Sequence, residues 1–480
     1  MTTSPEATLA QTREGLVRGV REGELTVWRG IRYAEAPVGE HRFAPPRPVR
    51  PWDGVRDATR LGAEPIQVAL PIPGFPQPGP DQREDCLFLN VWSPSTRGRR
   101  PVIVWINGGG FIGGAGSHYD GSVYARRHDV VFVTFNYRVN AFGYLHQPER
   151  PGSGNCGLLD QIEALRWVRD NIAGFGGDPA AVTVMGESAG GGSIGAMLGA
   201  PAARGLFRRA IVQSGSPGWL PMPQGLGRTT EVVLDNLGVT ADELTEVPAA
   251  DLLEASKRVR PGVKSQAYHP VVDGDVLPRH PLEGLTGEVD VLIGTCDKDF
   301  IDLGPQVLNP LEYVIRHFYG DDAWDRLLAV YTQTTSAGRD PRQDVLCGAF
   351  TQLPSIWLAD GLVRAGAKVW QYTFDYAGAG PIGATHASDV PFTFGRIRPE
   401  VLAPGADPAV AQEVADTMVH SFATFARTGD PGTPALPRWP AITPDDKATL
   451  SFDEAPRLKQ DRLSGQRLAA WRDFDPLLLS

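Results

Sequence analysis

The sequence predicts a protein of the α/β class with a parallel sheet, and three observations support this. Charge-free apolar runs at 102–106, 130–137 and 182–185 are typical of strands that are buried on both faces. Residues 158–172, between the last two runs, carry apolar side chains at helical spacing. A strand, a helix and a second strand in this order form the right-handed crossover that joins parallel strands.

The other elements follow in chain order. We expect short strands and loops over 19–57 and a strand over 84–92. The segment 63–83 is rich in Pro, Gly and Gln, which predicts an irregular surface loop near the functional site. Later strands are predicted for three further apolar runs: 210–213, 291–294 and 369–374.

No internal repeat or low-complexity linker divides the 480 residues, so we expect one domain spanning 1–480. Two long intervals between the late strands, about 217–290 and 300–368, have a mostly helical pattern broken by Pro and Gly. We expect these intervals to be cap-like helical insertions over the site.

Composition and charge exclude several classes of protein. The net charge is −10, from 46 basic and 56 acidic residues without long blocks of one sign. This favours a soluble protein and argues against a nucleic-acid groove. No apolar run reaches the roughly 18–20 residues that span a bilayer, and the first residues lack the pattern of a secretory signal. We therefore expect no membrane or nucleic-acid partner and a cytoplasmic location.

The four cysteines, at 86, 156, 296 and 347, form no C-x-x-C pair and have no His at ligand spacing. Free thiols in a reducing compartment are therefore expected, rather than disulfides or a metal site.

The chemistry is indicated first by the stretch 182–190, VTVMGESAG. Gly186 to Gly190 fit the pattern G-x-S-x-G, in which a strand turns sharply into a helix with Ser188 at the tip. Small flanking residues make room for that turn, and the first N–H groups of the helix stay unpaired. Ser193 fits the same five-letter pattern, but only Ser188 follows a strand-like run.

A glycine-rich loop, Asn107 to Phe111, ends the predicted strand at 102–106. Three successive glycines let backbone N–H groups turn toward one point, as a hydrolase needs for a developing oxyanion. Alone, such a loop is more often structural. Beside the turn at Ser188, the functional interpretation is favoured.

Many co-linear segments together resemble the type-B carboxylesterase/lipase family, the relatives of cholinesterases and para-nitrobenzyl esterases. The resemblance covers almost the whole chain and rests on the following segments: GIRYAEAPVGEHRF, EDCLFLNVW, NGGGFIGG, NYRVNAFGYL, GNCGLLDQIEALRWVRDNIAGFGGDPAAVTVMGESAGG, RRAIVQSGS, PVVDGDVLP, GATHASDVPFTFG and FARTGDPGTP. The resemblance implies the α/β-hydrolase fold, with a mostly parallel twisted central sheet and helices on both faces.

The resemblance also implies a catalytic triad in the order Ser, acid, His. His386, in Gly383-Ala384-Thr385-His386, matches the general base of the family. The acid is less clear, because the family pattern G-x-N-x-D-E-G reads GTCDKDF from Gly294 here. Asp299 replaces the usual Glu, with Asp297 and Asp302 as alternatives. One methylene less leaves the Asp299 carboxylate roughly 1.5 Å short unless the backbone moves inward.

Further roles are implied by the matching motifs. The oxyanion would be bound by the N–H groups of Gly109, Gly110 and Ala189. Glu187 resembles a buried acidic neighbour of the site, and Ser214 resembles the serine that hydrogen-bonds the triad acid. Arg42 with Glu84, and Arg138 with Asp160, resemble two structural ion pairs of the family. Cys86 lies where some members form a disulfide, but the usual partner position, near Pro65, has no Cys.

The expected activity is hydrolysis of small-molecule carboxylic esters through an acyl-enzyme intermediate, without a cofactor. Hydrolysis of carbamates or amides by the same triad is the alternative, and a non-catalytic binding protein is a third possibility. Four apolar residues suggest an apolar substrate pocket: Phe111, Ile112, Trp219 and Phe300. A monomer or small homo-oligomer is expected.

Overall fold

The structure is a computed structural model that describes residues 8–70, 76–215, 217, 227–259, 267–299, 305–460, 463 and 465–474. Its centre is an 11-stranded sheet with the strand order β14-β13-β12-β11-β10-β9-β7-β8-β6-β4-β3. The strands from β8 to β13 in this order are parallel, and the strands added at both edges are antiparallel. The predicted parallel sheet is therefore present.

The strands have the following bounds: β3 (Val20–Glu22), β4 (Leu25–Arg32), β6 (Phe88–Ser93), β7 (Arg100–Ile106), β8 (Val131–Phe135), β9 (Gly177–Glu187), β10 (Arg209–Gln213), β11 (Asp290–Cys296), β12 (Val369–Phe374), β13 (Thr449–Phe452) and β14 (Arg457–Lys459). A separate small sheet contains β1 (Leu9–Gln11), β2 (Leu16–Arg18) and β5 (Val55–Asp57). The crossover predicted from β8 to β9 passes over β7, which lies between these two strands.

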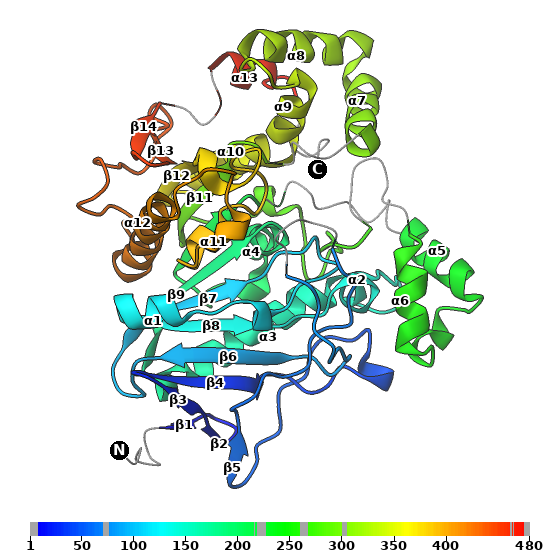
Figure 1. Cartoon of the computed structure of the whole chain (residues 1–480). Helices are drawn as coiled ribbons and strands as arrows, with labels where there is room; N and C mark the ends of the chain where they lie inside the picture. The colour runs from blue at the N-terminus through cyan, green and yellow to red at the C-terminus, as the bar shows by residue number, and fades with distance from the viewer. Residues whose placement is uncertain are drawn as a thin grey trace.

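Helices cover both faces of the sheet (Figure 1). Side chains of α3 (Cys156–Asn171), α4 (Ala189–Gly199) and α10 (Leu353–Arg364) belong to the apolar core on one face. Side chains of α1 (Ser122–His128), α11 (Val390–Thr393) and α12 (Pro408–Thr428) belong to the core on the other.

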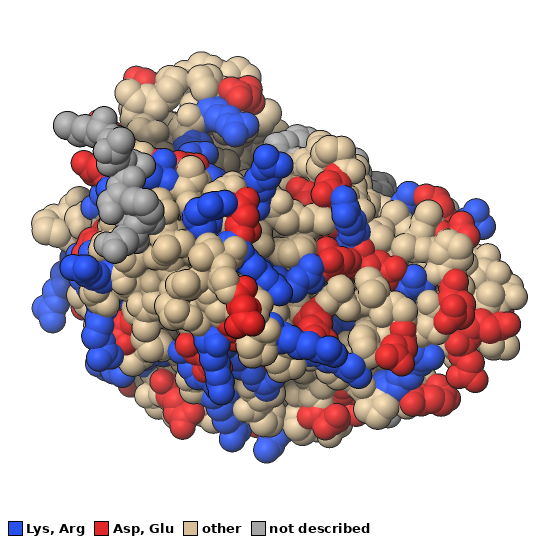
Figure 2. Space-filling view, turned by 90° about the horizontal axis from the view of Figure 1, so that it is seen from below, with Lys and Arg blue, Asp and Glu red and all other residues tan. Residues whose placement is uncertain are grey.

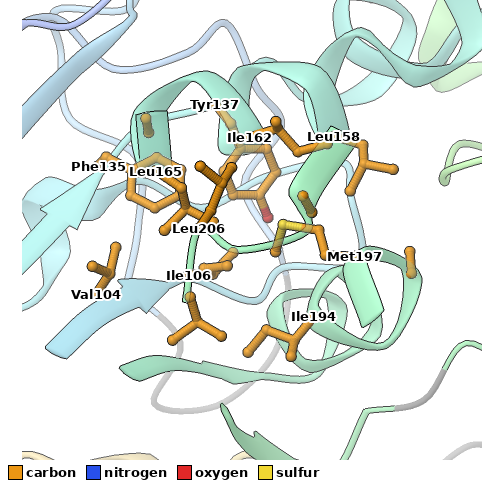
Figure 3. Close-up of a cluster of buried hydrophobic side chains, with 14 of the residues drawn as sticks. Val104, Ile106, Phe135, Tyr137, Leu158, Ile162, Leu165, Ile194, Met197 and Leu206 are labelled. Atoms are coloured by element: carbon orange, nitrogen blue, oxygen red, sulfur yellow. The ribbon is translucent and has the colours of Figure 1, made fainter. Parts of the chain in front are cut away.

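Alternating side chains of the central strands supply the two cores. On β9, Val184 packs in the first core and Met185 in the second; on β7, Val104 and Trp105 divide in the same way. This period of two follows from the pleat of a strand, so an uncharged run fills both faces at once. Figure 3 shows part of the first core, where side chains of α3 and α4 meet those of the sheet.

The two intervals predicted to be helical contain different amounts of helix. The first holds α5 (Gly227–Leu237) and α6 (Ala249–Lys257), and the second holds α7 (Pro305–Tyr319), α8 (Asp321–Thr334), α9 (Pro341–Cys347) and α10. Helices α7 to α9 and α13 (Gly465–Ala470) contribute to an apolar cluster of their own. In Figure 1 this cluster lies at the top of the molecule, apart from α5 and α6 at the right.

The described residues of the segment 63–83 form no helix or strand, as expected from their Pro, Gly and Gln content. On the face seen from below in Figure 2, basic and acidic side chains are interspersed. Among the helices in the described ranges, none has both the length and the apolar character needed to cross a membrane.

Candidate active site

The turn at Ser188 has the geometry that its sequence predicts. β9 ends at Glu187, α4 begins at Ala189, and Ser188 between them has φ 55° and ψ −120°. A positive φ is costly for a residue with a side chain and persists only where the surroundings enforce it. A Cβ on Gly190 would lie 2.0 Å from the carbonyl oxygen of Ile106, so only glycine fits there. Ser188 is thus held at the tip by close packing of the backbone.

Ser193, the other serine that fits the G-x-S-x-G pattern, lies inside α4. It is fully buried, and its hydroxyl accepts a hydrogen bond of 3.0 Å from the side-chain amide of Gln161. The strand-like run before Ser188 therefore distinguished the two serines correctly.

The structure brings Ser188, His386 and Asp299 together, although 198 positions separate the serine from the histidine. His386 Nε2 lies 2.8 Å from Ser188 Oγ, and His386 Nδ1 lies 2.9 Å from Asp299 Oδ1. Asp299 follows β11 and is fully buried, whereas Ser188 keeps 9% of its surface exposed. All three side chains project where parallel strands end, the edge at which α/β sheets bind ligands.

Asp299 reaches His386 despite its short side chain. Its second oxygen, Oδ2, accepts hydrogen bonds from the hydroxyl of Ser214 at 2.9 Å and from the N–H of Cys296 at 3.0 Å. Of the two alternative acids, Asp297 instead forms an ion pair with Arg339 at 3.1 Å. The other, Asp302, lies outside the described residues.

Glu187 lies directly beside this hydrogen-bonded chain. It is buried, and its Oε1 lies 3.4 Å from His386 Nε2. Burial, together with the nearby carboxylates of Asp389 and Asp299, raises the pKa of Glu187 to about 8 against the opposing effect of His386.

Asp389 is a further buried carboxylate near the site that the sequence analysis did not single out. It accepts a hydrogen bond of 2.9 Å from the side-chain amide of Gln213, and burial raises its pKa to about 6. Its position three residues after His386 was the available signal, but an aspartate in a polar stretch is ordinarily exposed.

The acidic surroundings determine the charge state of His386. Burial disfavours the imidazolium, but the carboxylates of Glu187 and Asp299 outweigh that effect and raise the pKa of His386 above its ordinary value. A histidine in this position readily accepts a proton and holds it as a stabilised cation.

The glycine-rich loop packs against the serine. A Cβ placed on Gly108 would lie 3.1 Å from the Cβ of Ser188, which shows how closely the loop approaches. Gly109 and Gly110 have φ of 121° and 60°. Within the described ranges, the N–H groups of Gly109, Gly110 and Ala189 donate to no protein acceptor, so they are available to an anion.

The residues just after the glycine-rich loop are hydrogen-bonded to the segment 63–83. The side-chain oxygen of Gln67 accepts the N–H of Gly114 at 2.6 Å, and Glu64 accepts a hydrogen bond from Ser117 at 2.8 Å. Phe111, by contrast, belongs to the core: it is 2% exposed and packs edge-on against Tyr144. Its predicted contribution to a substrate pocket is wrong, because the ring is buried in the apolar core. Trp219 and Phe300 lie outside the described residues.

The two predicted ion pairs are present, with shortest N–O distances of 2.6 Å for Arg42–Glu84 and 2.7 Å for Arg138–Asp160. The four cysteines, all within the described ranges, are free and buried. In the described part of the chain, no group of three or more His, Cys, Asp or Glu side chains could hold a metal ion.

Known proteins resemble this chain over nearly its whole length. Residues 6–471 match the carboxylesterase family. The para-nitrobenzyl esterase of Bacillus subtilis (strain 168) is 36% identical over 96% of this chain and 97% of its own. The phenmedipham hydrolase of Pseudarthrobacter oxydans is 34% identical over 94% of this chain and 97% of its own.

Solved structures agree with these relatives. The crystal structure of a carboxylesterase from Geobacillus stearothermophilus has 38% sequence identity and a TM-score of 0.85, covering 97% of this chain and 100% of the other. The chain therefore belongs to the carboxylesterase family, has the α/β-hydrolase fold and is a carboxylic ester hydrolase.

Proposed function

We propose that this enzyme hydrolyses small-molecule carboxylic esters with Ser188 as nucleophile, His386 as general base and Asp299 as the acid of the triad. The observation that carries the proposal is the continuous hydrogen-bonded chain from Ser188 Oγ through the imidazole to Asp299, at 2.8 and 2.9 Å. Each group in this chain can activate the next one, which is the logic of a serine hydrolase.

The reaction begins when His386 takes the proton of Ser188 as Oγ attacks the ester carbonyl carbon. Asp299 holds the imidazole in the tautomer that leaves Nε2 free to accept this proton. The tetrahedral oxyanion is bound by the N–H groups of Gly109, Gly110 and Ala189. The leaving alcohol then takes the proton from Nε2, and an acyl group remains on Ser188.

A water molecule completes the cycle. His386 takes one proton from the water, the hydroxide attacks the acyl carbon, and collapse of the second tetrahedral intermediate returns the proton to Ser188 Oγ. The carboxylic acid is released and the enzyme is regenerated, with no other reactant consumed.

The roles can be tested with two serines that fit the same sequence pattern. We expect Ser188→Ala to lower kcat on a short-chain chromogenic ester by roughly 10⁴–10⁶-fold. Ser193→Ala, which removes the hydroxyl bonded to Gln161, should keep kcat within a few-fold of the wild type. Equal activity of the Ser188→Ala variant would overturn the proposal.

Hydrolysis of carbamates or amides by the same triad is the second candidate function. It is favoured by the 34% identity with phenmedipham hydrolase, whose named substrate is a carbamate. Measuring kcat/KM on an ester, a carbamate and an amide with matched acyl and leaving groups would separate the candidates. We expect the ester to be the preferred substrate; a higher kcat/KM on the carbamate would reassign the activity.

Covalent labelling tests the role of Ser188 independently of any substrate. An organophosphate should modify Ser188 in the wild type and leave the Ser188→Ala variant unmodified, as read by mass spectrometry of the peptides. An unmodified wild-type chain would contradict the role of Ser188 as the nucleophile.

A further inference from the structure

Asp299 and His386 lie on separate loops, and the hydrogen bond between them depends on how these loops are held. The first loop, 297–299, follows β11, and the second, 380–386, lies after β12. An aspartate has only one methylene between its carboxylate and its backbone. Its reach therefore cannot compensate for a displaced loop as a longer side chain could.

Lys298 joins the two loops by its main chain and by its side chain. Its N–H donates to the carbonyl of Ala384 at 2.9 Å, and it forms a parallel bridge with Thr385, the residue before His386. Its ammonium group donates a hydrogen bond to the carbonyl of Ile382. A Cβ on Gly383 would lie 2.9 Å from that ammonium nitrogen, so the side chain lies directly against the loop.

The loop of Asp299 is itself anchored on its far side. Asp297 pairs with Arg339, and the thiol of Cys347 donates to the main-chain carbonyl of Asp299. The contacts of Lys298 therefore join this anchored loop to the loop that carries His386. The side chain of Lys298 touches neither Ser188 nor the imidazole in any contact of the described residues.

We propose that Lys298 is a positioning residue that holds the loop 380–386 at the distance at which Asp299 can hydrogen-bond His386. This inference rests on the proposed roles of Asp299 and His386. Displacing a catalytic group by about 1 Å can cost on the order of 10²-fold in rate. The ammonium of Lys298 is a strong donor to a main-chain carbonyl and can supply that restraint.

The test removes the ammonium and keeps the length of the side chain. We expect Lys298→Met to lower kcat by about 10–100-fold with KM within about two-fold, because the change affects alignment rather than substrate binding. Lys298→Arg, which retains a cationic donor, should recover part of the loss. Lys447→Met is the matched control, because Lys447 is also half-buried and pairs with Asp360 on α10, away from the triad.

A spectroscopic measurement separates this inference from the proposed function. The proton shared by His386 Nδ1 and Asp299 should give a far-downfield NMR signal in the wild type that is absent from an Asp299→Asn variant. We expect Lys298→Met to shift or broaden this signal, and Lys447→Met to leave it unchanged. The signal reports the hydrogen bond whether or not Ser188 is the nucleophile, which the Ser188→Ala variant tests by itself.

A coupling experiment completes the test. Asp299→Glu should be less damaging in the Lys298→Met background than in the wild type, because a released loop can accommodate the longer acid. The inference would be overturned if the effects of Asp299→Glu and Lys298→Met on kcat were additive. It would also be overturned if Lys298→Met and Lys447→Met had equal kcat and Lys298→Met left the NMR signal unchanged. If Lys298→Met does not fold, Lys298→Gln, which keeps a neutral donor, replaces it and should show a smaller loss of the same kind.

Discussion

The two sides of the proposed active site are built differently. Ser188 follows the buried strand β9, and its turn is fixed by glycines packed against neighbouring backbone. Asp299 and His386 lie on loops that are held by hydrogen bonds. Lys298 connects the two loops, and Ser214 and the thiol of Cys347 donate to Asp299. One side is determined by steric exclusion and the other by hydrogen bonds. The first tolerates almost no change in side-chain volume, whereas the second depends on specific donors and acceptors.

The largest effect should come from the polar side. We expect Asp299→Asn to lower kcat by about 10⁴-fold, because the amide no longer fixes the imidazole tautomer. Asp297→Asn removes a neighbouring carboxylate that pairs with Arg339 and should cost far less. Steady-state kinetics on one chromogenic ester compares the two variants. A larger loss in the Asp297→Asn variant would transfer the role of the acid to that residue.

On the packed side, the main effect of a substitution should be on the stability of the fold. Gly190→Ala places a methyl group 2.0 Å from the carbonyl oxygen of Ile106, and we expect it to lower the free energy of unfolding by at least about 3 kcal/mol. Urea unfolding measures the change. Gly465→Ala is the control, since a Cβ there meets no atom within 4 Å. Equal midpoints for the two variants would mean that the turn at Ser188 is not constrained by packing.

A buried carboxylate connects the polar side to the core and should make stability depend on pH. The pKa of Asp389 is raised from 3.8 to about 6, so the folded state holds this proton more tightly than the unfolded state. Its contribution to stability is complete below about pH 4 and is lost as the pH rises through about 6. Asp389→Asn should therefore raise the free energy of unfolding at pH 8 by up to about 3 kcal/mol.

The same series of unfolding measurements contains its own control. At pH 4 the Asp389→Asn variant should gain far less stability over the wild type than at pH 8, because the carboxyl group is then protonated in the folded state and partly protonated in the unfolded state. A stabilisation of the same size at pH 4 and pH 8 would show that the ionisation of Asp389 is not the cause.

The smallest expected effect concerns the pH dependence of kcat/KM. His386 must be neutral to accept the proton of Ser188, so its raised pKa places the acidic limb of kcat/KM at a higher pH. Glu187→Gln removes one of the carboxylates that raise this pKa. Because Glu187 itself holds its proton up to about pH 8, we expect the limb to move down by less than about one pH unit. An unchanged limb would assign the raised pKa to Asp299 alone.

The sequence allowed the packed side to be predicted more fully than the polar side. Uncharged runs and a glycine pattern determine backbone shape locally, so β9, α4 and the place of Ser188 follow from adjacent residues. The reach of Asp299 could not be deduced, because it depends on Lys298, Ala384 and Ile382 from two distant loops. Asp389 was missed for the same reason, since only tertiary packing buries it.

Other predictions failed where the local sequence pattern does not determine how a residue packs in the folded protein. Phe111 at the end of the glycine-rich loop suggested a pocket, but its ring is buried in the apolar core. Strands β13 and β14 and the long helix α12 were not predicted. β13 and α12 have short or mixed sequences and gain their apolar contacts only against the finished sheet, and β14 is a short, mostly exposed edge strand.

The buried cysteines also have a practical consequence. Burial raises the pKa of all four thiols, for Cys156 to about 11. The thiolate is the nucleophile that attacks an alkylating reagent, so modification of these buried thiols in the native protein requires local opening. Cys86 and Cys156 lie in the body of the molecule, whereas Cys296 and Cys347 flank Asp299. The alkylation rate of each cysteine would therefore report the rate of local opening in its own region, without an engineered label.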